Sequence, residues 1–478
     1  MKLSLKVKGA YGLTAVADQC LFYLYGTFYI FFLTTVAGIS PAIAGVISAV
    51  GAVWDAFIAV VAGYISDNVH SPWGKRKPMI MAWAFPMAIA TSLLFTYIDA
   101  SMTFKIVYYV GATLIYWTAF PMFFIPFLAW GAELTEDYNE RTLLRSFAYV
   151  GNTVGMAIGT LLPTVIVDYL MNLGRSTEDA WQETVILVGV CVFIALFFGP
   201  AMIREHSNAY TPEEKAARKA RKRSLKTTIS AIFITFKEFS HVLRLRPLRY
   251  LIYASIFYLG ASTIFASDRM FFFTYKMEAS ASAISIMMAV STFSGVCLIP
   301  LVVATRKIAD KRTQFVFGIT ICALVMMLYR FIGNTSLLAT CVMLVAYDTA
   351  NMLYWQLLPS MIYDVCEVDE LVSGKQRQGS IVSLQSLSES LSEAVGMVVL
   401  GGILEAAGFD EALSAQTETA LYWVSNSYSF IPSVFMLLAA LMVYKYPITR
   451  ERFEHVLNGV AKRRRGEDVD LSEYADVI

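Results

Sequence analysis

Charged residues are scarce in this sequence. Only 16% of its 478 residues are Asp, Glu, Lys or Arg, whereas a soluble protein carries about 25%. Hydrophobic residues make up 57% of the chain, and they gather into tracts of about 20 residues, the length of a membrane-spanning helix. The composition therefore excludes a soluble enzyme with a single anchor and predicts a polytopic membrane protein.

Several motifs of catalysis and energy supply are also missing. The ATP-binding pattern GxxxxGK[ST] and the metalloprotease pattern HExxH do not occur. The six cysteines form no CxxC pair, so we interpret them as small hydrophobic residues. All four histidines fall in segments predicted to be cytoplasmic, which excludes a histidine proton relay in the membrane. We expect no enzymatic activity, no cofactor and, at a net charge of +1, no nucleic-acid partner.

Twelve apolar tracts are long enough to cross a bilayer, which predicts an all-α membrane protein with twelve transmembrane helices. The tracts lie near residues 10–35, 42–66, 78–98, 105–131, 146–170, 184–203, 248–275, 282–304, 314–332, 336–362, 380–406 and 422–446. The second tract opens with Ser40 and Pro41, a capping residue followed by a proline at the first helical position.

Lysine and arginine are concentrated in alternate loops. One side of the predicted membrane receives runs such as KAARKARKRSLK and the KRRR of residues 462–465. By the positive-inside rule, both termini are expected to be cytoplasmic. The stretch 204–247 separates a six-helix half, 1–203, from a second half, 248–446, which a cytoplasmic tail, 447–478, follows. Within this linker, ISAIFITFKEFSHVL is interpreted as an amphipathic helix on the inner membrane face.

The two halves repeat a pattern of charges in their cytoplasmic loops. GKRK between spans 2 and 3 matches RKIADKR between spans 8 and 9, and acid-rich segments with basic residues after them follow spans 4 and 10. Two pseudo-symmetric halves are typical of secondary transporters, which hold substrate at the midplane. These charges would form ion pairs that favour opening of the transporter to one side of the membrane. Alternatively, they serve only to set the orientation of the helices in the membrane. The candidate gating residues are Asp67, Arg76, Glu133, Arg141, Asp364 and Arg377.

Five carboxylates fall at mid-depth in the predicted spans, where a charge costs roughly 2.5–3.5 kcal/mol. They are Asp18, Asp55, Asp348, Glu389 and Glu393. Glu389 and Glu393 are four residues apart and share a helix face. Because two carboxylates in a low dielectric disfavour each other's ionised form, we expect at least one to be protonated at neutral pH. The pair suits a proton carrier, although a buried acid bonded to a carbonyl would explain it equally.

Other polar and aromatic residues within the spans are candidates for the cavity wall. Arg269 is the base most expected in the cavity, unless its side chain extends outward to the interface. Trp117 and Trp355 lie within spans and offer ring faces on which a sugar could stack, but most such aromatics serve packing. The surplus of acids over bases favours cation coupling or a cationic substrate.

Short motifs along nearly the whole chain point to a family. They include YG at 11–12, VAGIS at 36–40, WDA at 54–56, WGKRKP at 73–78, AELTEDYNERT at 132–142 and SGKQRQGSIVSLQS at 373–386. With these motifs the sequence resembles the glycoside–pentoside–hexuronide cation symporters, the melibiose permease family of the major facilitator superfamily. The resemblance implies the major facilitator fold and transport of a solute together with a cation.

The functional residues of that family carry over unevenly. The resemblance places the first cation-binding aspartate at Asp55, and the substrate-side pair of span 11 at Gln385 and Ser386. The resemblance places Ala59 where the family has its second cation-binding aspartate. It places Phe124 where the family has the aspartate that precedes the IPF motif, here residues 125–127. Sodium requires several oxygen ligands around one point, whereas a single carboxylate can carry a proton. Proton coupling, or uncoupled facilitated diffusion, is therefore favoured over sodium coupling.

In span 1, the acid that resembling permeases use for sugar falls on Gln19, next to Asp18. Residues expected to bind the coupling ion, H⁺ or Na⁺, are Asp18, Asp55, Glu389 and Glu393. Residues expected to bind substrate are Asp18, Gln19, Tyr23, Trp117, Arg269, Asp348, Trp355, Gln385 and Ser386.

The leading hypothesis is therefore a cation-coupled importer of a glycoside or similar small solute, working by alternating access. It is expected to be a monomer in the lipid bilayer of the cell membrane. An acidic cavity would also suit a transporter of an amine or an amphiphile. A membrane sensor or scaffold that has lost transport, and a membrane enzyme, rank last because no extra domain or catalytic constellation is visible.

Overall fold

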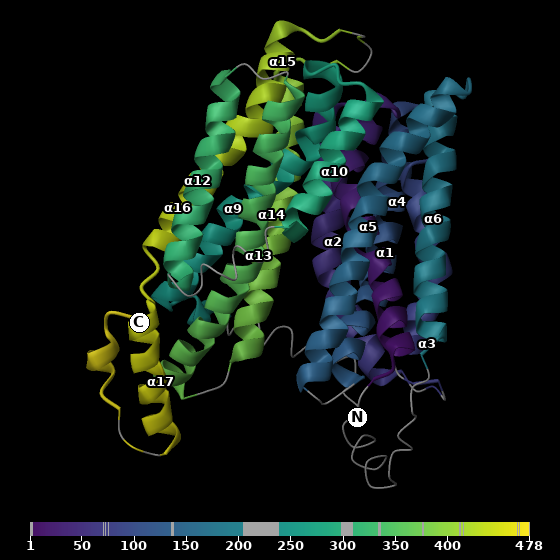
Figure 1. Cartoon of the computed structure of the whole chain (residues 1–478). Coiled ribbons are helices and arrows are strands. Elements are labelled where there is room, and N and C mark those ends of the chain that lie inside the picture. Colours follow the sequence, from purple (N-terminus) through teal and green to yellow (C-terminus); the bar gives the residue numbers. More distant parts are fainter. Residues whose placement is uncertain are drawn as a thin grey trace. The chain divides into compact units, whose positions relative to one another are not determined.

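The fold is described from a computed structural model. It describes residues 3–69, 71, 73–74, 76–134, 138–203, 239–297, 309–332, 336–374, 377–410, 413, 415–465, 467 and 469–477. Every regular element in these ranges is a helix. Eleven of these helices are long and apolar enough to cross a membrane, and Figure 1 shows them as long rods.

Six of these helices come from the N-terminal part of the chain. They are α1 (Leu5–Thr35), α2 (Pro41–Asn68), α3 (Lys77–Leu94), α4 (Met102–Glu133), α5 (Tyr138–Asn172) and α6 (Thr177–Ala201). Each corresponds to one of the first six predicted tracts, although α3 and α6 end before their tracts do.

The remaining elements follow residue 238. They are α9 (Arg246–Phe271) with the π-helix η1 (Phe272–Lys276), α10 (Ala281–Cys297), α12 (Lys311–Ile332), α13 (Leu337–Ser373), α14 (Gln378–Ala406), α15 (Glu418–Ser425) with the π-helix η2 (Asn426–Phe430), α16 (Ile431–Tyr444), α17 (Arg450–Arg464) and the 3₁₀ turn η3 (Leu471–Tyr474).

Eleven predicted tracts thus correspond to helices long enough to span a membrane. For the eighth tract, the described apolar helix, Ala281–Ser294, is shorter. The count of twelve helices and the cytoplasmic side of the termini stay predictions. The division of the chain at 204–247 also stays a prediction. Most of this linker, including most of the expected amphipathic helix, lies outside the described residues.

Several helices are longer than the tracts that predicted them. The tract 146–170 lies inside α5, which begins at Tyr138. The tract 336–362 begins at the N-cap of α13, which continues beyond the tract to Ser373. A hydropathy pattern ends where the lipid ends, whereas a helix continues until its backbone is interrupted. For α13 the interruption is Gly374, whose positive φ of 67° forms a left-handed C-cap.

The start of α2 agrees with its sequence signal only in part. The helix begins at Pro41, as expected, but the Ser40 side chain makes no capping hydrogen bond. Proline lacks an N–H and has its φ preset, so it favours this start without that bond.

The described residues form two compact units, which we treat separately. Unit 1 comprises the described residues of 1–224, 266–292 and 397–424, and unit 2 those of 225–265, 293–396 and 425–478.

A ridge of glycines brings α1 and α5 together in unit 1. Gly151, Gly155 and Gly159 follow one another at intervals of four residues, so they share one face of α5. A Cβ at each of the three would meet backbone atoms of α1. Such spacing of small residues lets membrane helices approach closely.

Aromatic stacking and a hydrogen bond from an arginine order unit 2. Tyr258 of α9 stacks on Tyr354 of α13 with ring centroids 4.3 Å apart, and Phe265 stacks on Tyr347 at 3.8 Å. The π-helix η2, a rare backbone form often found at functional sites, places Asn426 where its Oδ1 accepts a hydrogen bond from Arg330 Nε at 2.7 Å.

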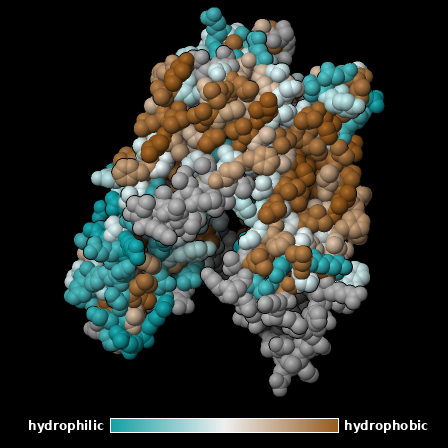
Figure 2. Space-filling view, in the orientation of Figure 1, coloured by the Kyte–Doolittle hydropathy of each residue, from teal (hydrophilic) through white to brown (hydrophobic). Residues whose placement is uncertain are grey.

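The surface of the helices is strongly apolar. Figure 2 shows hydrophobic side chains over the spanning helices and hydrophilic ones over the C-terminal segment that contains α17. On α12, Phe317, Ile321, Leu324 and Leu328 are all more than half exposed and recur at helical spacing. Water would not tolerate so large an apolar surface, whereas lipid does. The chain is therefore a multi-pass membrane protein.

Candidate functional site

Asp18 and Asp55, the two aspartates of unit 1 predicted to lie at mid-depth, point into the protein. Asp18 of α1 is buried, and its carboxylate accepts a hydrogen bond from Gln19 Nε2 at 3.1 Å. Asp55 of α2 is half-buried and makes no hydrogen bond or ion pair within the described part of the chain. The buried Tyr116 of α4 interacts electrostatically with both carboxylates. Both acids therefore lie on the side of their helices that is near α4.

The exposed residues of α2 show which way Asp55 faces. They are Val46, Val50, Val53, Phe57 and Val60, with Ile65 near the end of the helix. At 100° per residue the first five side chains fall on one arc of the helix, and Asp55 lies on the opposite side, about 180° from the centre of that arc. The exposed arc is the lipid-facing side, so the Asp55 carboxylate is directed away from lipid.

Trp117 is surrounded by other aromatic rings. Its ring meets Tyr25 edge-on at 5.0 Å, and Tyr25 stacks on Tyr116 at 5.4 Å. The Trp117 side chain is only 5% exposed and packs against Gly51, where any Cβ would collide with it. This gives Trp117 a packing role, and its predicted contact with substrate stays a prediction. Tyr23, by contrast, is half-buried.

Arg269 does not extend outward to the interface. It lies near the end of α9, in unit 1, and is 3% exposed, with its Nη1 3.8 Å from the sulfur of Met288. The alternative that its side chain reaches the membrane surface is therefore wrong for this structure. Whether this buried guanidinium meets substrate stays a prediction.

In unit 2, the predicted residues of α14 belong to a side-chain network. Gln385 Nε2 donates to Ser255 Oγ of α9 at 2.6 Å and to Glu389 Oε1 at 3.0 Å. Glu389 and Glu393 both lie within Coulombic range of Tyr354. The two glutamates therefore share a helix face that looks toward α13, as their spacing predicts.

The other predicted residues of unit 2 differ in exposure. Asp348 of α13 is 7% exposed, and its carboxylate accepts a hydrogen bond from Ser294 Oγ of α10 at 2.9 Å. Trp355 is 47% exposed, and Ser386 is exposed as well. Trp355 and Ser386 thus lie at the surface of the described residues, whereas Asp348 is engaged by a hydrogen bond within the protein.

An ion pair joins two of the predicted gating residues in unit 1. Arg76, which precedes α3, places Nη2 2.8 Å and Nε 3.2 Å from Glu133 Oε1 at the end of α4. Its Nη1 donates to Ser66 Oγ of α2 at 2.5 Å. The buried Arg76 guanidinium thus ties together the ends of three helices. The side chains of Asp67 and Arg141 lie outside the described residues.

The predicted gating residues of unit 2 also form ion pairs, with partners that sequence did not identify. Lys311 Nζ, at the start of α12, lies 2.8 and 2.7 Å from the two oxygens of Asp364. Arg377 binds both oxygens of Asp369, at 3.0 and 2.5 Å. The ion pairs are present, and their role in gating stays a prediction.

The two units use the same arrangement of consecutive basic residues. Arg76 pairs with an acid near the end of α4, while Lys77 Nζ donates to the carbonyls of Ala201 and Ile203 at the end of α6. Lys311 pairs with an acid of α13, while Arg312 donates to the carbonyl of Tyr444 at the end of α16. Cations stabilise helix C-termini, and the correspondence supports an internal repeat.

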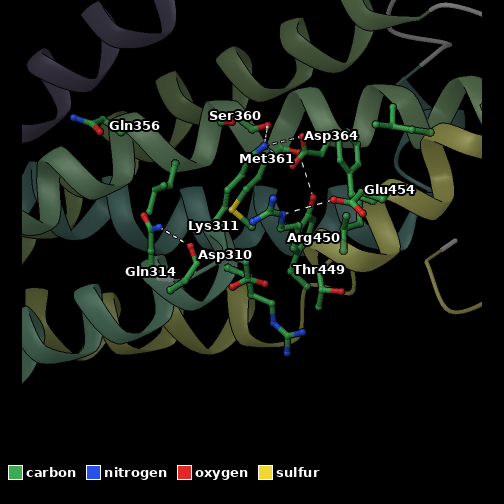
Figure 3. A pocket seen from close by; sticks show the side chains of 17 residues that line it. Asp310, Lys311, Gln314, Gln356, Ser360, Met361, Asp364, Thr449, Arg450 and Glu454 are labelled. Atoms are coloured by element: carbon green, nitrogen blue, oxygen red, sulfur yellow. Dashed lines mark hydrogen bonds and ion pairs between the residues drawn. The ribbon is translucent and has the colours of Figure 1, made fainter. Parts of the chain in front are cut away.

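Unit 2 also holds a cavity of about 610 Å³, shown in Figure 3. Its wall includes the Lys311–Asp364 pair, together with Gln356 and Ser360 of α13 and Phe453 of α17. Of the residues predicted to bind ion, bind substrate or gate, only Asp364 lines it.

Comparison with known proteins places the chain in a family. The family model described as MFS/sugar transport protein matches residues 10–450. The chain belongs to this family. This confirms the resemblance that the sequence motifs indicated.

Individual members of the family show similarity over nearly full length. The isoprimeverose transporter of Lactiplantibacillus pentosus is 26% identical over 450 residues, covering 92% of this chain and 88% of the relative. The glucuronide carrier protein homolog of Escherichia coli is 24% identical and covers 99% of both chains. A putative sulfoquinovose importer of Escherichia coli is 24% identical, covering 100% of this chain and 98% of the relative.

Solved structures show the same fold. A crystal structure of a D-xylose–proton symporter superposes with a TM-score of 0.61 at 14% identity, covering 92% of this chain and 96% of that one. A chain from a study of proton-dependent oligopeptide transporters gives a TM-score of 0.68 at 12% identity, with 96% and 99% covered. At these identities the likeness establishes the major facilitator fold alone.

Proposed function

We propose that this family member is a proton-coupled symporter that brings a glycoside or related sugar into the cell across the cell membrane. The observation that carries the proposal is Asp55, a mid-depth carboxylate directed away from lipid and without a partner among the described residues. A carboxylate in the membrane is costly, and one that binds no neighbouring cation is well suited to bind a transported one.

The choice of proton over sodium rests on the neighbours of Asp55. Ala59 follows one turn later on α2, and Phe124 lies on α4, so neither position supplies an oxygen ligand. A proton needs only the single carboxylate. The half-buried Glu389 and Glu393, which share a face of α14, are the second candidate ion-linked group.

The choice of a sugar rests on the relatives. Three of them have names that refer to isoprimeverose, a glucuronide and sulfoquinovose. The exposed Trp355 and Ser386 and the networked Gln385 would supply a ring face and hydrogen-bonding groups for such a solute. We propose that Asp18 and Gln19 of α1, in unit 1, also take part in binding the solute, and that the protein works as a monomer.

Uptake into proteoliposomes tests the proposal. The purified protein would be assayed with labelled isoprimeverose, a glucuronide and sulfoquinovose, under an imposed proton gradient and, separately, a sodium gradient. Wild type should accumulate one of them above equilibrium with the proton gradient alone. Asp55→Asn should equilibrate that sugar without accumulating it, because its amide cannot carry the proton.

The exposed Asp168 of α5 provides a matched control, because Asp168→Asn makes the same chemical change away from the interior. Accumulation by Asp55→Asn as steep as in wild type would refute the coupling role. Accumulation driven only by sodium would refute proton coupling, and uptake of none of the sugars but of an organic amine would favour the alternative substrate class.

A further inference from the structure

The cavity of unit 2 lies where two helices begin. Its wall includes Asp310, Lys311 and Arg312 at the start of α12, and Thr449 and Arg450 at the start of α17. The first turn of a helix leaves backbone N–H groups without partners inside the helix, and the helix dipole is positive at that end. Both helix starts therefore favour negative charge in the cavity.

Most of the charged side chains in the wall are already engaged by other groups. They are Asp310, Lys311, Arg312, Asp364, Arg450 and Glu454. Lys311 Nζ lies 2.7 Å from Asp364 Oδ2, and Asp310 Oδ1 accepts a hydrogen bond from the start of its own helix. Arg450 Nε lies 3.6 Å from Glu454 Oε1, and both of these side chains are exposed. Because an exposed pair of this kind is weak, Arg450 can also interact with a ligand.

Arg312 is the cation of the wall that lacks an acidic partner. Its guanidinium donates to the carbonyl of Tyr444 and lies 5.4 Å from the centre of that residue's ring. Within the described part of the chain it pairs with no carboxylate. The positive charge of Arg312 therefore adds to that of the two helix starts and is available to an anion.

A buried amide of the wall also has an unsatisfied oxygen. Gln314 is 8% exposed, and its Nε2 donates to the carbonyl of Ala309 at 2.8 Å. Its Oε1 is buried and has no hydrogen-bond partner among the residues that the structure describes. Since a carbonyl oxygen accepts hydrogen bonds, a ligand that satisfies Gln314 must carry an O–H or N–H group. Figure 3 shows Gln314 in the wall together with Gln356 and Ser360 of α13.

The size and the apolar part of the wall favour an organic ligand over a bare ion. A volume of about 610 Å³ falls within the range of small-molecule sites, roughly 300–1,000 Å³. Protein interiors normally leave few voids larger than a water molecule. Leu357 and Met361 of α13 and Phe453 and Leu457 of α17 contribute apolar surface, which an inorganic ion alone would leave without contacts.

We propose that this cavity is a binding site for a phosphate ester that carries hydroxyl groups. The phosphate pairs with Arg312 and lies against the two helix starts, where its several oxygens can accept hydrogen bonds from more than one group. The hydroxyl groups donate to Gln314 Oε1 and to Glu454. A soluble sugar phosphate and the headgroup of phosphatidylglycerol share this chemistry. The further idea that occupancy slows transport rests on the proposed function, whereas binding itself does not.

Isothermal titration calorimetry tests the site. The full-length protein in phosphatidylcholine nanodiscs, whose headgroups carry no hydroxyl, would be titrated with glucose 6-phosphate. Arg312→Gln should weaken binding by about tenfold or more, the factor for losing a charge-assisted hydrogen bond. Leu457→Trp keeps every charge and enlarges a side chain of the wall that is 41% exposed. It should weaken binding by filling part of the cavity.

A cation outside the cavity provides the matched control. Arg452 lies two residues after Arg450, does not line the cavity, and forms an exposed pair with Asp476 at 3.4 Å. Arg452→Gln should therefore leave the affinity unchanged. The site would be overturned by three results: no saturable binding to wild type, wild-type affinity in both Arg312→Gln and Leu457→Trp, or equal weakening in Arg312→Gln and Arg452→Gln.

The role of the hydroxyl groups is tested at Gln314. Gln314→Met removes the accepting oxygen at similar size and should weaken binding of glucose 6-phosphate about fivefold, the factor for one neutral hydrogen bond. Binding of inorganic phosphate, which has no sugar hydroxyls, should not change. Equal weakening of both probes would contradict recognition of the hydroxyl groups.

Nanodiscs of different lipid distinguish the two sources of the ester. If the lipid headgroup occupies the cavity, phosphatidylglycerol should weaken the apparent affinity of wild type for glucose 6-phosphate more than phosphatidylserine does, because phosphatidylserine gives the membrane the same charge without hydroxyl groups. Equal affinities in the two lipids would assign the cavity to the soluble ester.

Sugar counterflow in proteoliposomes tests the link to transport. Slower counterflow when glucose 6-phosphate is present on both sides, in wild type but not in Arg312→Gln, supports regulation through this cavity. Equal rates with and without the ester would reject that link. If wild type moves no sugar, the proposed function fails, while calorimetry still decides whether the site exists.

Discussion

The ion pair between Arg377 and Asp369 gives the sharpest prediction of stability. The side chain of Asp369 is fully buried, that of Arg377 is 17% exposed, and two hydrogen bonds of 3.0 and 2.5 Å join them. Removing the cation leaves a buried carboxylate uncompensated, which typically costs about 3–5 kcal/mol. We therefore expect Arg377→Gln to lower the free energy of unfolding by about that amount.

The double variant separates the value of the pair from the cost of the orphaned charge. Asp369→Asn with Arg377→Gln removes both charges and should recover most of the loss, because no ion remains buried. The comparison variant Arg175→Gln breaks the exposed pair with Glu183 and should change stability by about 1 kcal/mol or less. The free energies would come from unfolding in mixed micelles by titration with sodium dodecyl sulfate.

Two outcomes would refute this reasoning. One is a loss in Arg377→Gln no larger than in Arg175→Gln, which would mean that water reaches Asp369. The other is a double variant as unstable as the single one, which would mean that shape and hydrogen bonding at this site matter more than charge.

Two other changes test the packing and the ion pairs of unit 1. Gly155→Ala should lower the free energy of unfolding by about 1–3 kcal/mol, because its Cβ would lie 2.9 Å from the backbone carbon of Val16. Gly111→Ala on α4 is the control, because a Cβ there would meet nothing within 4 Å. Equal stability of the two variants would contradict the role of the glycine ridge. Arg76→Met should change the ratio of the conformations open to the two sides of the membrane by about tenfold, the factor expected for losing charge-assisted hydrogen bonds. The rate of sugar counterflow measures this change. A rate equal to that of wild type would show that the Arg76–Glu133 ion pair is not part of the gate.

The sequence predicts the spans and the acids within them well, for a physical reason. A carboxylate in lipid is so costly that one such as Asp55, within a long apolar tract, is visible in the sequence alone. Its direction away from lipid does not follow from the sequence, because only the structure shows which apolar side chains of α2 are exposed. The exact ends of α5 and α13 do not follow, since both helices continue past the apolar tract.

The partners of the charged residues at the helix ends could not be predicted from the sequence. The segment after span 10 offers several acids within a few residues of one another, and spacing cannot decide that Lys311 takes Asp364 while Arg377 takes Asp369. Arg464 was interpreted only as positive charge on the inner side, because its partner Glu370 lies 94 residues away. The two π-helices have no sequence signal, whereas the glycine spacing of α5 was visible and could have predicted its close contact with α1.

Proton movement during sugar entry tests the central claim most directly. Cells containing the protein, de-energised and weakly buffered, would receive isoprimeverose, a glucuronide or sulfoquinovose while a pH electrode follows the medium. The account predicts prompt alkalinisation with the sugar that is transported, and none in cells with the Asp55→Asn variant. Sugar entry without alkalinisation, or alkalinisation that persists in Asp55→Asn, would contradict it.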